Sequence, residues 1–101
     1  MAKTKRLEPI PPGEILAEEF MKPNGISQNR LSRDIDVNPA RINYIVHGRS
    51  SITAAIALRL GKYFSTTPEL WMNLQASYEL RLARTGEWPR IEPRVRVLAA
   101  E

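Results

Sequence analysis

Helix-capping residues, prolines and glycines recur along this chain, and the distance between them is about the length of one short helix. These signals constrain the fold more than any other feature of the sequence. The expected N-caps are Ser27, Asn38, Thr53 and Thr67, because short polar side chains satisfy the free N–H groups of a first helical turn. Proline stands at Pro12, Pro39 and Pro68, where its fixed φ suits the first helical position. With stops at glycines and turn residues, these signals predict five helices, near residues 12–22, 27–35, 38–47, 53–64 and 67–84.

Apolar residues repeat at helical spacing in each segment and indicate the faces that are buried. The first four segments carry Ile15, Leu16 and Phe20, then Leu31 and Ile35, then Ile42, Ile45 and Val46, and then Ile56, Leu60 and Phe64. In the fifth, Leu70, Leu74, Tyr78 and Leu82 form one stripe that Trp71 flanks. We interpret Leu70, Trp71, Leu74 and Tyr78 as either core or dimer interface, since aromatic and leucine side chains anchor both.

Length and composition limit the chain to one domain without a membrane span. A chain of 101 residues is one ordinary domain, and no stretch approaches the roughly 18 consecutive apolar residues of a membrane helix. No apolar run follows residues 1–6, so no secretory signal is expected, and the lack of cysteine excludes disulfides and thiolate sites. We therefore expect a cytoplasmic all-α domain over residues 12–84, with an N-terminal arm at 1–11 and a C-terminal tail at 85–101.

The tail contains Pro89 and Pro93 and then the alternating run Arg94-Val95-Arg96-Val97, which predicts a strand or an extended segment. Such a segment can add a strand to the sheet edge of a partner protein. It can equally pair within a dimer or remain a loose tail, and the sequence leaves these alternatives open.

The segments at 27–35 and 38–47 are short and are joined only by Asp36-Val37. This is the geometry of a helix-turn-helix, whose second helix lies in the major groove of DNA. Its apolar positions, Leu31, Ile35, Val37, Ile42 and Ile45, let the two helices cross steeply and share one small core. A structural helical hairpin with no role on DNA is the alternative.

Helix geometry predicts the DNA contacts. The candidates are the residues on the outer face of 38–47 and at its ends, namely Gln28, Asn38, Pro39, Ala40, Arg41, Asn43, Tyr44, His47 and Arg49. Asn43 can form two hydrogen bonds with adenine, whereas Arg41 and Arg49 are better placed for phosphates. Tyr44 could equally brace the helix, and the charge of His47 could equally stabilise its C-terminal end.

The distribution of charge supports a nucleic-acid partner. The whole chain has 15 Lys and Arg against 11 Asp and Glu, and the formal net charge is +4. Between Lys22 and Arg49 there are five basic and two acidic residues, so the helix-turn-helix segment carries most of the excess. Positive charge of this kind suits a phosphate backbone, and on its own it would also suit an acidic protein.

Several motifs spread along the chain occur together in one known family. They are Pro12-Gly13-Glu14-Ile15-Leu16, Glu18-Glu19-Phe20, Gly25-Ile26-Ser27-Gln28, Arg41-Ile42-Asn43, Gly48-Arg49, Ile52-Thr53, Ala57-Leu58-Arg59-Leu60 and Trp71-Met72-Asn73-Leu74-Gln75-Ala76-Ser77-Tyr78-Glu79-Leu80. In this combination, over residues 9–84, the sequence resembles the HigA-type antitoxins, which belong to the Xre/Cro-type helix-turn-helix group. The resemblance implies a five-helix, lambda-repressor-like DNA-binding domain.

The resemblance also implies a function. It predicts a dimer that binds an inverted-repeat operator, represses its own operon and neutralises a small ribonuclease toxin. The alternative is a stand-alone helix-turn-helix repressor with no toxin partner. Asp36 stands where the family usually has glycine in the turn, and Ser32 replaces a usual alanine, so the geometry of the turn is where a departure is expected.

The residues do not predict an enzyme. His47 is the only histidine, and Glu18 and Glu19 are adjacent on a helix and point in different directions. The five glycines are scattered, and none belongs to a phosphate-binding loop. We therefore expect no catalytic residue, no metal and no cofactor.

Overall fold

The computed structural model describes residues 8–99, which form six α-helices and, within that range, no strand. The helices are α1 (Pro12–Ile15), α2 (Gln28–Ile35), α3 (Pro39–Val46), α4 (Ala54–Phe64), α5 (Pro68–Thr85) and α6 (Trp88–Ile91). A π-helix, η1 (Leu16–Met21), continues α1, and a 3-10 helix, η2 (Glu92–Arg94), continues α6. The predicted all-α fold is confirmed.

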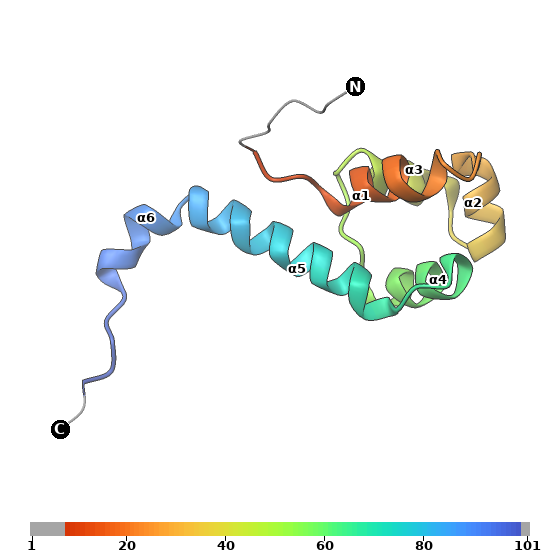
Figure 1. The fold of residues 1–101 in the computed structure, drawn as a ribbon. Helices are drawn as coiled ribbons and strands as arrows, with labels where there is room; N and C mark the ends of the chain where they lie inside the picture. Colours follow the sequence, from red (N-terminus) through yellow and green to blue (C-terminus); the bar gives the residue numbers. More distant parts are fainter. Residues whose placement is uncertain (1–7, 100–101) are drawn as a thin grey trace.

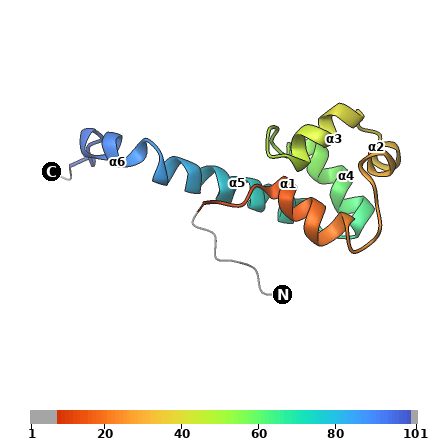
Figure 2. The same ribbon diagram turned by 90° about the horizontal axis from the view of Figure 1, so that it is seen from above.

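The molecule is a compact cluster of helices with a projecting arm. Helices α1 to α4 gather at one end, and α5 runs away from them towards α6 and the C-terminus (Figure 1). The view from above shows the same separation (Figure 2). The radius of gyration is 16.9 Å, whereas a compact chain of this length has about 13 Å. Much of the surface of the arm, α5 and α6, therefore makes no contact with the rest of the chain.

The four predicted N-caps all form. The side-chain oxygens of Ser27, Thr53 and Thr67 accept hydrogen bonds from the backbone N–H three residues later, at 3.0, 3.4 and 3.2 Å. Asn38 Oδ1 accepts from the N–H of Ala40 at 2.7 Å. Since such caps contribute about 1 kcal/mol each, local sequence explains where these helices begin.

The core lies inside the cluster. Its buried apolar residues are Leu16, Met21, Leu31, Ile35, Ile42, Ile45, Ile52, Ile56, Ala57, Leu60 and Trp71. Trp71 has no exposed surface, its ring contacts Phe20 at a centroid distance of 4.8 Å, and its Nε1 donates to Thr66 Oγ1 at 2.9 Å. Leu70 and Leu74 pack against this core, half-buried. These residues were predicted to lie either in the core or in a dimer interface. The structure shows Trp71 in the core of one chain.

The buried face of α5 differs from the predicted stripe. Its buried residues are Trp71 and Gln75, with Leu74 and Tyr78 half-buried, while Leu82 is 44% exposed. Leucines and tyrosine spaced by four residues advance about 40° around the helix at each step, because an α-helix has 3.6 residues per turn. The stripe therefore turns away from the core before it reaches Leu82.

The first predicted helix also departs from regular α geometry. Within η1 the N–H of Lys22 donates to the carbonyl of Ala17, five residues back, at 2.9 Å. This winding places Leu16 and Met21, also five residues apart, in the core, whereas the predicted Ile15 and Phe20 are only half-buried.

The start of the tail differs from the prediction, because α6 and η2 occupy residues 88–94, where no helix was expected. Arg94, the first residue of the run that was expected to be extended, ends η2. Pro89 and Pro93 both fall in the first turn of their helices, where proline is tolerated. Extended backbone begins at Val95, with φ −95° and ψ 120°. Most of the expected N-terminal arm, residues 1–7, and the end of the tail, residues 100–101, lie outside the described part of the chain.

Candidate nucleic-acid interface

The turn between α2 and α3 has the geometry of a helix-turn-helix. Asp36 adopts the left-handed conformation, with φ 59° and ψ 54°, at the position where a glycine was expected from the resemblance. The N–H of Val37 donates to the carbonyl of Ser32 at 3.0 Å and closes the end of α2. Ser32 itself is buried, so its small size suits the contact between helices.

The structure places most of the predicted DNA contacts on the surface. Ile42 and Ile45 face the core with no exposed area, which turns the opposite face of α3 outwards. The exposed candidates are Asn38, Pro39, Ala40, Asn43, Tyr44, His47 and Arg49, and the half-buried ones are Gln28 and Arg41. They come from the start of α2, from α3 and from the loop that follows it.

A hydrogen bond between side chains joins the two helices at this surface. Asn43 Nδ2 donates to Gln28 Oε1 at 3.1 Å. Because Nδ2 carries two hydrogens, one N–H and the Oδ1 acceptor of Asn43 have no partner among the described residues. The amide is therefore oriented by α2 and still has a donor and an acceptor side by side.

His47 was predicted either to contact DNA or to stabilise the C-terminal end of its helix. The structure favours the second role. Its Nδ1 lies 2.8 Å from the carbonyl oxygen of Asn43, so a protonated Nδ1 donates to the last turn of α3. The same carbonyl also accepts the backbone N–H of His47 at 3.2 Å, so the imidazole adds a second contact at the end of α3. Tyr44 is 50% exposed and points its ring away from the core.

The arginines of this region differ in how they are paired. Arg30 Nε contacts Asp34 at 3.3 Å, and Lys22 contacts Glu18 at 3.1 Å. Arg33, Arg41 and Arg49 have no ion pair within residues 8–99. Arg41 is half-buried, and its Nε is enclosed without a hydrogen-bond partner in the same range.

Asp34 is held by a second helix as well. Tyr63 on α4 donates its hydroxyl to Asp34 Oδ2 at 2.5 Å. This hydrogen bond lowers the pKa of Asp34, with a smaller contribution from Arg30, and raises the pKa of the Tyr63 hydroxyl. The contact fastens α2, and hence the start of the helix-turn-helix, to α4.

Gln75, a buried residue that contacts the loop after α3, was not among the predicted site residues. Its Oε1 accepts from the backbone N–H of Ile52 at 2.9 Å, and its Nε2 donates to Glu79 at 2.8 Å. Ile52 ends the loop that carries Arg49, so α5 holds this loop in place. A glutamine one helical turn after a buried Trp71 is the signal that could have identified it, since both lie on one helix face.

The described range offers neither a metal site nor a membrane span. Residues 8–99 contain no cluster of three His, Asp or Glu side chains able to hold a metal ion. None of the helices there combines the length and apolar character needed to cross a bilayer.

Comparison with known proteins agrees with this geometry. The helix-turn-helix family model matches residues 18–71. Virulence-associated protein I of Dichelobacter nodosus is 47% identical over 74 residues, which are 73% of this chain and 68% of that protein. The chain belongs to the helix-turn-helix family.

Solved structures similar to this chain indicate which group of the helix-turn-helix family it resembles. The structure described as Pseudomonas aeruginosa antitoxin HigA with the higBA promoter is 40% identical, covers 91% of this chain and all of that one, and has a TM-score of 0.86. The antitoxin GraA in complex with its operator is 39% identical, covers 98% of this chain and all of that one, and also has a TM-score of 0.86. Within the family, the sequence and fold place the chain with the HigA-type antitoxins.

Proposed function

We propose that this chain is the antitoxin of a toxin–antitoxin pair. As a dimer it binds an inverted-repeat operator through α2 and α3 and represses its own operon, and it neutralises a small ribonuclease toxin. The observation that carries the DNA-binding part is the oriented Asn43 amide on the exposed face of α3. Support also comes from HigA and GraA, solved with a promoter and with an operator, at 40% and 39% identity.

Asn43 is the proposed reader of a base. Its remaining N–H and its Oδ1 match N7 and N6 of an adenine in the major groove, while the bond to Gln28 fixes the amide plane. Ala40 and Tyr44 lie on the same exposed face and offer apolar contact to a thymine methyl.

Arginines and the start of α3 are the proposed phosphate contacts. Arg41 and Arg49 flank the recognition helix and have no ion-pair partner within residues 8–99, so their guanidinium groups can pair with phosphate. Asn38 and Pro39 are exposed at the start of α3, where the positive end of the helix dipole favours an anion. These contacts fix the register of the protein on DNA without reading sequence.

A two-fold dimer places two copies of α3 about 34 Å apart, one turn of DNA. We therefore expect an inverted-repeat operator in the DNA upstream of the coding sequence. Sedimentation of the full chain at micromolar concentration tests the dimer, and a stable monomer there would exclude it.

Base reading by Asn43 is tested by Asn43→Ala. Binding to the upstream DNA is measured by fluorescence anisotropy with single base-pair changes. The variant should lose about 1–3 kcal/mol of discrimination at one base pair. Asn73→Ala, an exposed asparagine on α5, is the matched control. Unchanged specificity in Asn43→Ala would mean that another residue reads the operator.

Phosphate binding is tested by Arg41→Ala. Affinity should fall for all sequences, and the slope of log K against log salt should become shallower by about one. Arg81→Ala on the exposed surface of α5 is the control and should keep the wild-type slope. If both variants keep wild-type binding, α3 does not lie in the groove as proposed.

The antitoxin role is tested in cells. The short reading frame next to this gene is expressed with and without the chain. Growth arrest by the neighbour, relieved by this protein, would support the antitoxin function. No arrest or no rescue would leave the alternative, a stand-alone helix-turn-helix repressor with no toxin partner.

A further inference from the structure

Beyond the first turns of α5, the arm formed by α5 and α6 leaves apolar side chains exposed. Leu80 and Leu82 on α5, Trp88 on α6, and Val97 and Leu98 beyond η2 are exposed, the last two at 91% and 94%. A single copy of the chain does not cover them, because the arm projects from the cluster (Figure 1). Exposed apolar surface of this extent marks a site of association.

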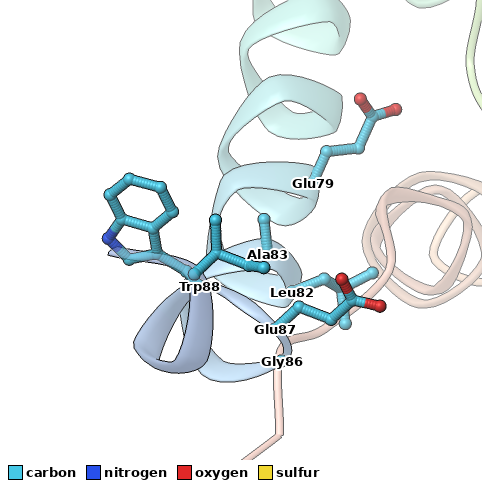
Figure 3. Close-up of a pocket in the computed structure, with 7 residues that line it drawn as sticks. Glu79, Leu82, Ala83, Gly86, Glu87 and Trp88 are labelled. Atoms are coloured by element: carbon cyan, nitrogen blue, oxygen red, sulfur yellow. The ribbon is translucent and has the colours of Figure 1, made fainter. Parts of the chain in front are cut away.

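Part of this surface forms a hollow of about 570 Å³ where α5 meets α6. Apolar atoms of Leu82, Ala83, Trp88 and Ile91 line it, together with Glu79 and Glu87. The carboxylates of Glu79 and Glu87 lie on one side of the hollow and the Trp88 indole on the other (Figure 3). The hollow therefore suits a segment that is apolar and basic.

The extended end of this same chain has that chemistry. Arg94, Val95, Arg96 and Val97 alternate positive and apolar side chains, and Leu98 follows them. The backbone is extended at Val95, and no helix follows up to residue 99. Successive side chains of an extended segment point to opposite sides, so valines and arginines separate onto two faces.

We propose that residues 94–98 of one copy occupy the hollow of a second copy, and that the exchange is reciprocal. The valines pack against the apolar wall, and the arginines face the two carboxylates. Glu79 already accepts a hydrogen bond from Gln75, but a carboxylate has room for more acceptor contacts. Within residues 8–99, Glu87 has only a weak, exposed contact with Arg90 at 4.0 Å. This inference rests on the dimer of the proposed function and identifies its contact.

The geometry favours a second copy over the chain's own tail. Ile91 lines the hollow, and the residues between it and Val95 are held in η2, closed by a hydrogen bond from Val95 N–H to the Glu92 carbonyl at 3.0 Å. The tail leaves α6 in a direction away from α5 (Figure 1). To fill its own hollow, the chain would have to unwind η2.

The first test uses the full chain with Val97→Asp. Val97 is almost fully exposed, so the substitution does not disturb the fold of a single copy. Sedimentation equilibrium should show the dimer dissociation constant rising by roughly tenfold or more, because a charge replaces a buried apolar contact. Leu58→Asp, also at an exposed apolar residue but on α4, is the matched control and should leave the constant unchanged.

The second test uses Trp88 as a reporter. Trp71 has no exposed surface, so acrylamide quenching that depends on protein concentration reports on Trp88, and Trp88→Phe supplies the Trp71 background. In the wild type, quenching should fall as the dimer forms, and in Val97→Asp it should stay high. Protection of Trp88 that is independent of concentration would overturn the proposal, because it would mean that the chain fills its own hollow.

The third test exchanges charges. Arg96→Glu and Glu87→Arg should each weaken the dimer, and the chain carrying both should recover most of the wild-type affinity, because opposite charges meet again. Absence of recovery, or a Val97→Asp dimer as tight as the wild type, would place the tail elsewhere and overturn the proposal.

Failure of this proposal and failure of the proposed function give different results. If Val97→Asp remains a dimer and binds the upstream DNA, the tail contact is wrong and the repressor function stands. If the wild-type chain is itself a monomer that binds this DNA without specificity, the dimeric repressor fails, and the tail contact fails with it.

Discussion

The cluster of α1 to α4 and the α5–α6 arm differ in where their apolar side chains lie. In the cluster, Leu31, Ile42 and Leu60 have no exposed area, and a single chain completes the core. In the arm, Leu82 and Trp88 remain 44% and 39% exposed. The core of the cluster is thus closed within one copy, whereas the arm keeps apolar surface exposed.

Helix α5 contains the boundary between these regions. Its first turns carry Trp71 and Gln75 into the core, and no residue from Glu79 to Arg90 is buried. The helix continues because its own backbone hydrogen bonds and its cap at Thr67 support it. Only the first turns of α5 are therefore packed against the cluster, while the rest of the helix is exposed.

The two tryptophans give the largest expected contrast. Trp71→Ala should lower the free energy of unfolding by about 3–5 kcal/mol, because it leaves a cavity among Phe20 and Phe64. Trp88→Ala should lower it by less than about 1 kcal/mol, since the side chain is partly exposed. Urea denaturation followed by circular dichroism measures both, at a protein concentration below the dimer dissociation constant, where loss of self-association does not add to the effect.

Substitutions of the two tryptophans should affect self-association in the opposite order from their effects on the free energy of unfolding. Trp88→Ala should weaken the dimer, whereas the milder Trp71→Phe, which keeps a folded core, should leave it close to the wild type. Equal losses of unfolding free energy from the two alanine variants would contradict the distinction between cluster and arm.

Gln75 gives the next largest effect and tests the boundary itself. Gln75→Ala leaves the buried N–H of Ile52 without its acceptor, which should cost about 1–3 kcal/mol in unfolding free energy. Because Ile52 ends the loop with Arg49, affinity for the upstream DNA should fall too. Asn73→Ala, exposed on the same helix, should change neither measurement, and a neutral Gln75→Ala would show that α5 does not hold the loop.

Features set by neighbouring residues could be predicted from the sequence. The caps at Ser27 and Asn38 and the short connection at Asp36 determine α2, α3 and the turn between them. The exposed side of α3 follows from Ile42 and Ile45, so most of the candidate DNA contacts were placed on the surface correctly. Whether those residues touch DNA stays a prediction.

Features that depend on distant parts of the chain could not be predicted. The bond from Ile52 to Gln75 joins residues 23 positions apart. Pro89 and Pro93 looked like helix breakers, but each stands in a first helical turn, where the missing N–H costs nothing. The hollow beside Trp88 exists only because α6 forms there, so its residues gave no local signal.

The smallest expected effect concerns the contact between α2 and α4. Because the Tyr63 hydrogen bond lowers the pKa of Asp34, this carboxylate contributes stability above about pH 4, its ordinary range, and the contribution is lost as the pH falls towards the lowered pKa. Tyr63→Phe should therefore raise the pKa of Asp34, as measured by NMR titration of its carboxyl group. The gap in urea midpoint between wild type and variant should be wider at pH 7 than at pH 3. Tyr44→Phe, on the exposed face of α3, is the matched control; if it moved the pKa of Asp34 as far as Tyr63→Phe does, the tie between α2 and α4 would not be its cause.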